Sequence, residues 1–174
     1  KPIIFAPNHQ YAFMDALLLV MVTRKIPYFL VRADIFKKSF FNFVLRTLKM
    51  MPVYRQRDSV DVISKNEETF SKCIDILNNG KHLTIFPEGN HSKIRKIRPI
   101  RKGLLRIGFR TINENPDSNN LVIIPVGINY DDHSRFQSDI FIKFGEPITL
   151  EDYNKRYKKN QAKAFSDVSA AIYD

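Results

Sequence analysis

Short apolar runs alternate along this chain with longer segments of helical periodicity, and this alternation constrains the fold more than any other feature. The apolar runs that we interpret as strands lie at residues 3–6, 28–31, 51–54, 82–86, 121–128 and 140–144. The helical segments end near residue 24, cover residues 35–49, 62–79 and 103–113, and begin again at residue 151. Strands that alternate with helices predict an α/β fold with a largely parallel central sheet flanked by helices.

Two residues inside these elements carry predictions of their own. Pro125 interrupts the fifth predicted strand, and a proline cannot donate a hydrogen bond to a sheet. We therefore expect an irregular or edge position there. Cys73 lies on the apolar stripe of the third predicted helix, so we interpret it as a core residue and not as a nucleophile. Because it is the single cysteine, an internal disulfide is excluded.

A polar turn joins the first predicted strand to the first helix, and it contains His9, with Asp15 six residues further on. On one continuous helix, at about 100° per residue, the two side chains would point apart. They can meet only if His9 lies in the turn and Asp15 inside the helix. The carboxylate would then fix the imidazole tautomer and leave the other ring nitrogen as a general base. The alternative is a histidine and a helix-start aspartate with structural roles.

Polar residues also follow the third and fourth predicted strands. Arg55 and Arg57 follow the third strand, and Glu88 and Gly89 follow the fourth. Because parallel strands end at one edge of a sheet, we expect these residues and His9 to line one site at the carboxyl edge. Arginine suits a phosphate through its planar fork of donors, glycine lets the backbone approach a ligand, and a carboxylate can hold a substrate hydroxyl.

The charge of the chain favours a polyanionic partner. The net charge is +10, which is typical of proteins that bind nucleic acid, an anionic membrane surface or phosphorylated substrates. Six basic residues lie between residues 93 and 102, as a solvated loop or as an electropositive rim beside the site. The chain carries no helix-turn-helix, zinc or RNA-binding sheet signature, so we expect no nucleic-acid partner, although a basic nucleic-acid-binding domain remains an alternative.

Membrane contact is expected to be peripheral, on the cytoplasmic face. No stretch reaches the roughly 18 apolar residues of a membrane span. The helix predicted at residues 35–49 is apolar on two faces, one with Phe36 and Phe43 and the other with Phe41 and Leu45. It is either enclosed by core or presents one face to lipid. We expect residues 1–174 to form one domain, with a further segment before Lys1.

The chain resembles the glycerolipid acyltransferases, the family of glycerol-3-phosphate and 1-acylglycerol-3-phosphate (lysophosphatidic acid) O-acyltransferases. Four blocks appear in the family's order: Asn8-His9 through Asp15, Met51-Pro52-Val53-Tyr54-Arg55, Phe86-Pro87-Glu88-Gly89 and Ile123-Ile124-Pro125-Val126. Four blocks in order, at α/β spacing, are far more specific than any one of them.

The resemblance implies a role for each matching residue. His9 resembles the catalytic base and Asp15 its orienting partner. Arg55 resembles a phosphate-binding residue, and Glu88 and Gly89 resemble the pair that binds the acceptor. The acyl donor would be acyl-CoA or acyl carrier protein, and the acceptor a glycerol phosphate. No bound cofactor is implied, and no metal-ligand spacing is present.

Two departures from the family pattern bear on the acceptor. Five residues separate His9 from Asp15 where four are commonest, and this spacing, with the block around Pro52, looks like the branch that uses glycerol-3-phosphate or dihydroxyacetone phosphate. His91 stands where the family usually has arginine, so phosphate binding would draw on Arg95 or its neighbours. A catalytically inactive lipid-binding module is the other alternative.

Overall fold

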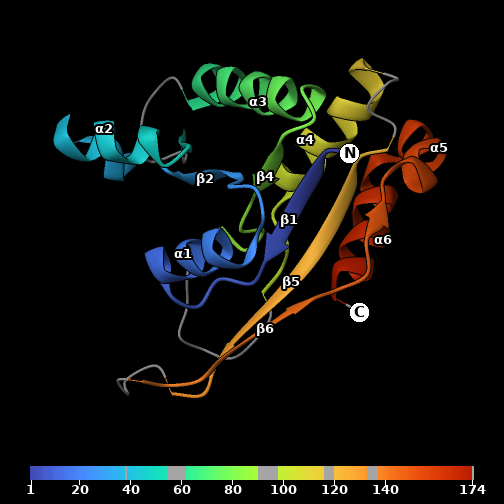
Figure 1. Cartoon of the computed structure of the whole chain (residues 1–174). Helices are drawn as coiled ribbons and strands as arrows, with labels where there is room; N and C mark the ends of the chain where they lie inside the picture. The colour runs from blue at the N-terminus through green and yellow to red at the C-terminus, as the bar shows by residue number, and fades with distance from the viewer. Residues whose placement is uncertain (38, 55–61, 90–97, 116–119, 133–136, 174) are drawn as a thin grey trace.

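A largely parallel sheet forms the centre of the molecule, as predicted (Figure 1). The computed structural model describes residues 1–37, 39–54, 62–89, 98–115, 120–132 and 137–173. The strands are β1 (Ile3–Pro7), β2 (Tyr28–Arg32), β3 (Met50–Val53), β4 (His82–Thr84), β5 (Val122–Tyr130), β6 (Ile140–Phe144) and β7 (Ile148–Thr149). Their order is β3-β2-β4-β1-β5-β6, and β7 also pairs with β5. The pairs among β1 to β5 are parallel, whereas β6 and β7 run antiparallel to β5.

Helices cover both faces of this sheet. They are α1 (Ala12–Val22), the 3₁₀ helix η1 (Ala33–Lys37), α2 (Ser39–Thr47), α3 (Val62–Asn78), α4 (Lys102–Glu114), α5 (Glu151–Lys159) and α6 (Gln161–Tyr173). Because side chains alternate along a strand, Ile4 and Ala6 of β1 face a core with α3, α4 and α6. Phe5 faces the opposite core, with α1 and α2. The result is a three-layer fold in which β1 is central.

The first of these cores also contains the single cysteine. Cys73 of α3 is fully buried, and burial raises the pKa of its thiol to about 12. Since the thiolate is the nucleophilic form of cysteine, this environment confirms the prediction of a core residue.

The helix predicted at residues 35–49 needed correction, whereas the segment predicted to be helical from residue 151 is helical and consists of α5 and α6. The helix expected at residues 35–49 is divided into η1 and α2. Neither of its two predicted apolar faces is uniformly buried or uniformly exposed. Leu45 is buried at 7% exposure, whereas Phe43 is 74% and Leu48 40% exposed; the side chains of Phe40 and Phe41 lie outside the described part of the chain. The C-terminal segment is also divided, because Asn160 ends α5 and its side chain accepts a hydrogen bond from the Lys163 N–H at the start of α6.

The sequence predicted an irregular or an edge position for Pro125, and the structure shows the irregular one: the strand is interior, but its pairing partner changes at this residue. On one side β5 pairs with β1, and on the other it pairs first with β7 at Val122 and Ile123, then with β6 from Val126. Pro125 stands where the partner changes, and its carbonyl accepts from the Gly145 N–H at 2.9 Å. The N–H that a proline lacks would point toward β6 and β7, where the regular series of interstrand hydrogen bonds is already interrupted.

Candidate active site

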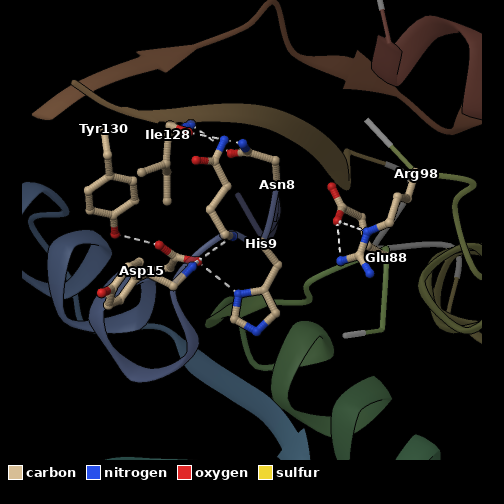
Figure 2. A network of polar contacts seen from close by, with 9 residues as sticks. Asn8, His9, Asp15, Glu88, Arg98, Ile128 and Tyr130 are labelled. Atoms are coloured by element: carbon tan, nitrogen blue, oxygen red, sulfur yellow. Dashed lines mark hydrogen bonds and ion pairs between the residues drawn. The ribbon is translucent and has the colours of Figure 1, made fainter. Parts of the chain in front are cut away.

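The turn after β1 brings His9 and Asp15 together, as the sequence predicted. His9 lies in the turn and Asp15 in the first turn of α1. The distance from His9 Nδ1 to Asp15 Oδ2 is 2.8 Å (Figure 2). The backbone N–H groups of Gln10 and Tyr11 donate to the same oxygen at 2.9 and 2.8 Å. Asp15 thus folds the turn around its own carboxylate and presents Nδ1 of the imidazole to it.

Asn8 attaches this turn to β5. Its side-chain amide donates to the Ile128 carbonyl at 3.0 Å, and its side-chain oxygen accepts from the Ile128 N–H at 2.7 Å. These two bonds have the same pattern as the paired backbone hydrogen bonds between neighbouring strands, and they lie one residue before His9. On the other side, the imidazole stacks on the Phe86 ring with 4.0 Å between centroids. The imidazole is therefore held by the turn, by β5 and by the segment after β4.

The carboxylate of Asp15 is fully buried, and its second oxygen accepts a hydrogen bond from the Tyr130 hydroxyl at 2.5 Å. Burial by itself would raise the pKa of Asp15, but hydrogen bonds from His9, Tyr130 and the Tyr11 backbone hold that pKa below its ordinary value. Because an ionised carboxylate only accepts, the neutral imidazole of His9 donates from Nδ1 to Asp15 and has Nε2 as its acceptor nitrogen. An acceptor nitrogen on the imidazole is what a general base requires.

A cavity of about 480 Å³ lies beside His9. Its apolar lining comes from the sheet and from both helical layers: Phe13, Ala16, Leu30, Val31, Ile35, Met50, Val53, Phe70, Ile85, Phe86, Pro87, Leu104 and Ile107. Gly89 lines the same cavity, so the ends of β1 and β4 do meet at one site. A mostly apolar cavity with a few polar groups is the usual form of a small-ligand site.

Glu88 follows β4 and is 7% exposed. One of its oxygens, Oε2, accepts from Arg98 Nε at 2.8 Å and from Arg98 Nη2 at 2.5 Å (Figure 2). The backbone at Arg98 is also held, because the Tyr173 hydroxyl donates to the Arg98 carbonyl at 2.7 Å and accepts from the Ile100 N–H at 3.0 Å. The last turn of α6 thereby fixes the segment that carries Arg98.

Gly89 adopts a φ of +75°, which favours glycine because other residues are strained there. A Cβ at this position would lie 3.4 Å from Cγ of Arg101. Arg101 also lines the cavity and donates its backbone N–H to the Pro87 carbonyl at 2.7 Å. The glycine predicted to approach a ligand therefore lies directly beside a cationic side chain.

Several predicted site residues lie outside the described part of the chain, namely Arg55, Arg57, His91 and Arg95.

Two residues of the polar network were missed by the sequence analysis. Tyr130 is separated from Asp15 by 115 positions, and no local pattern connects them. Arg98 was included only as one of six basic residues at 93–102, and nothing in their spacing selects it. Among the described residues, no group of three or more His, Cys, Asp or Glu side chains could hold a metal ion.

Comparison with known proteins gives a consistent result. The sequence model of the family described as Acyltransferase matches residues 1–129. An uncharacterised acyltransferase of Schizosaccharomyces pombe is 31% identical over 97 residues, which are 55% of this chain and 14% of that protein. Glycerol-3-phosphate O-acyltransferase 2 of Saccharomyces cerevisiae is 28% identical over 108 residues, 62% of this chain and 14% of that protein.

The fold is also found in a solved structure. The crystal structure of the 1-acyl-sn-glycerophosphate (LPA) acyltransferase PlsC from Thermotoga maritima superposes with a TM-score of 0.57 at 21% identity. The likeness covers 98% of this chain and 67% of PlsC. The chain thus spans about a seventh of the two fungal proteins and two thirds of PlsC. With three quarters of its length matched by the family's sequence model, this chain belongs to the acyltransferase family.

Proposed function

We propose that this chain transfers a fatty acyl group from an acyl thioester to a hydroxyl of a glycerol phosphate. The observation that carries the proposal is the His9–Asp15 pair at the wall of a mostly apolar cavity. The cavity offers space for an acyl chain, and each methylene group that leaves water for such a site contributes about 0.8 kcal/mol. The yeast relative acts, by its name, on glycerol-3-phosphate.

In this mechanism Nε2 of His9 removes the proton from the acceptor hydroxyl as its oxygen bonds to the thioester carbonyl carbon. The resulting tetrahedral oxyanion collapses, the carbon–sulfur bond breaks, and the thiolate takes the proton back from the imidazolium. Asp15 stabilises that imidazolium and keeps the ring in the productive tautomer. Direct transfer is favoured over an acyl-enzyme, because Cys73 is buried in the core and no Gly-x-Ser-x-Gly motif is present.

The acceptor would bind between the His9 turn and the segment after β4. We propose that Gly89 and the Glu88–Arg98 pair form part of this subsite, with Arg98 offering its guanidinium to the acceptor phosphate. The side chain of Arg98 is 30% exposed, so a phosphate can reach it without unfolding its surroundings. Arg55, Arg57, His91 and Arg95 remain proposed from the sequence as further contacts to the acceptor.

The decisive experiment is a radiolabelled transfer assay with the full-length protein. Glycerol-3-phosphate and 1-acylglycerol-3-phosphate are offered in parallel, each with acyl-CoA or acyl carrier protein as donor. We expect the label to appear in one acylated glycerol phosphate, and the four combinations identify the acceptor and the donor. If no combination exceeds the His9→Ala background, the proposal of acyl transfer is wrong and a lipid-binding module without turnover takes its place.

We further propose that the protein works at an anionic membrane surface. No described helix is long and apolar enough to cross a bilayer. Apolar side chains are exposed on the layer of α1, η1 and α2: Phe13, Met14, Met21, Val22, Ile35 and Phe43. Phe13 and Ile35 also line the cavity, so this surface adjoins the site where a lipid product would leave. Exposed apolar side chains that gather beside a ligand site would suit an interaction surface.

Co-sedimentation with liposomes tests this surface. We expect binding to anionic vesicles that falls as salt rises, because each basic residue near the bilayer contributes about 1 kcal/mol. Phe43→Ser should weaken binding, whereas Ile63→Ser on α3, which removes an equally exposed apolar side chain on the other layer, should not. Replacing Arg95, Lys96 and Arg98 with Ser tests the basic loop. Equal binding to neutral and anionic vesicles, or none to either, would contradict the electrostatic part.

A further inference from the structure

Tyr130 contacts the proposed catalytic pair from the opposite side of the carboxylate. It stands at the end of β5, is 7% exposed, and donates to Asp15 Oδ1 at 2.5 Å. It lies one position beyond the residues that the family's sequence model matches. Burial and the neighbouring Asp15 raise the pKa of the Tyr130 phenol far above its usual value. The phenol therefore stays protonated, and able to donate, across the pH range of an enzyme assay.

The two oxygens of Asp15 have very different surroundings. Oδ2 accepts from His9 Nδ1 and from the backbone N–H groups of Gln10 and Tyr11. Among the described residues, Oδ1 has a single donor, the Tyr130 hydroxyl. A buried carboxylate oxygen without a donor is costly. The hydroxyl thus satisfies Oδ1 and also fixes the rotation of the carboxylate, so that Oδ2 faces the imidazole.

One strand holds both ends of the turn that carries His9. The backbone of Ile128 binds the Asn8 side chain, and two residues later Tyr130 binds Asp15 (Figure 2). The ring of Tyr130 is packed in the core beside α1, 5.6 Å from the ring of Tyr11 between centroids. β5 lies between β1 and β6 in the sheet. The hydroxyl is therefore delivered from the end of a strand, where Tyr130 pairs with Ile140 of β6, and not from a loop.

We propose that Tyr130 is a positioning residue for the general base, acting on His9 through Asp15. This inference rests on the proposed acyl transfer. The hydroxyl has two effects: it holds the carboxylate in the orientation that aligns the imidazole, and it withdraws negative charge from the oxygen pair. With the hydroxyl in place, Asp15 orients the imidazole without holding the imidazolium proton too strongly.

Tyr130→Phe tests the proposal, since it keeps the ring and removes the hydroxyl. We expect kcat to fall about tenfold, as for one lost hydrogen bond to a charged group, while KM for both substrates stays within about twofold. The groups that face Asp15 are His9, Tyr11 and Tyr130. The acid limb of kcat/KM should move to higher pH, because a carboxylate that has lost a donor attracts the imidazolium proton more strongly.

The matched control is Tyr157→Phe, which removes a hydroxyl from a partly buried tyrosine on α5 that stacks on Phe109, outside the site. It should leave kcat and the pH profile unchanged. A Tyr130→Phe protein with wild-type kcat and an unmoved acid limb would overturn the proposal. So would a loss of activity that only follows a lowered melting temperature, with the pH profile unchanged, because a purely structural role has that signature.

A second readout needs no substrate. The proton on His9 Nδ1, held by Asp15, gives a downfield NMR resonance that His9→Ala identifies by its loss. We expect Tyr130→Phe to shift this resonance and Tyr157→Phe to leave it in place, and an unmoved resonance in Tyr130→Phe would contradict the inference. If the wild-type protein transfers no acyl group, the proposed function fails, while this measurement still decides whether Tyr130 acts on His9.

Discussion

The site contains two polar pairs, His9 with Asp15 and Glu88 with Arg98, that are built in different ways. Asp15 is fully buried, and its donors come from its own turn and from the end of β5. Glu88 is also buried, but its partner Arg98 is 30% exposed and is held in place by Tyr173 from the last turn of α6. An interior carboxylate with several fixed donors is rigid, whereas a partly exposed guanidinium can change partners at little cost.

This difference suits two different tasks. A general base has to stay aligned within a few tenths of an ångström, which a rigid first pair provides. A cation that receives a phosphate has to share its donors with the incoming ligand, which the second pair allows. We therefore expect changes at the first pair to act on kcat and changes at the second pair to act on KM for the acceptor.

The largest effect is expected for His9→Ala, which removes the proposed base. Turnover should fall by about 10²-fold to 10⁴-fold, while circular dichroism and the melting temperature stay close to wild type, because His9 lies in a turn. His82→Ala, a histidine on β4 that does not line the cavity, is the matched control. Near-wild-type turnover of His9→Ala would end the proposed mechanism.

Asp15→Asn should be nearly as damaging as His9→Ala. The amide can donate to the imidazole and so favours the wrong tautomer, and we expect a loss of about 10²-fold or more in kcat with KM almost unchanged. Steady-state kinetics with both substrates varied measure it. A mild effect would make Asp15 a structural residue of the turn and would remove the distinction between the two pairs.

Arg98→Ala should act on the acceptor and not on the donor. Loss of a charge-assisted contact costs about 1.5–3 kcal/mol, which corresponds to a rise of roughly tenfold to a hundredfold in KM for the phosphorylated acceptor. Arg106→Ala removes an exposed arginine of α4 and serves as control. If KM for the thioester rises in place of KM for the acceptor, Arg98 belongs to the donor site, and Arg55→Ala becomes the next variant to test.

Tyr173→Phe should have the smallest effect and the most specific one. It removes the hydroxyl that holds the backbone at Arg98 and Ile100 but leaves the Glu88–Arg98 pair in place. A net loss of about 0.5–1.5 kcal/mol would raise KM for the acceptor roughly twofold to tenfold at constant kcat. An equal fall in kcat would show that the two pairs are not independent.

The sequence alone predicted much of the fold and the first pair. The alternation of apolar runs with helical segments indicated the parallel sheet, and the spacing of six positions between His9 and Asp15 required a histidine in the turn and a carboxylate in the helix. It left open whether Pro125 has an irregular or an edge position, because the periodicity of one strand does not reveal its neighbours. It also could not place Arg98, since six basic residues in ten positions are equivalent when only the sequence is considered.

Local geometry is therefore what the sequence by itself determined. Strand, turn and helix follow from residue type and periodicity over a few positions, and these place His9 within hydrogen-bonding distance of Asp15. Only the tertiary structure decided which distant residues complete the site. Tyr130 reaches Asp15 because β5 lies beside β1, and Tyr173 reaches the Arg98 segment because α6 packs on the core that includes α4. The order of strands and the packing of layers depend on the free energy of the whole chain, and no short stretch of residues contains them.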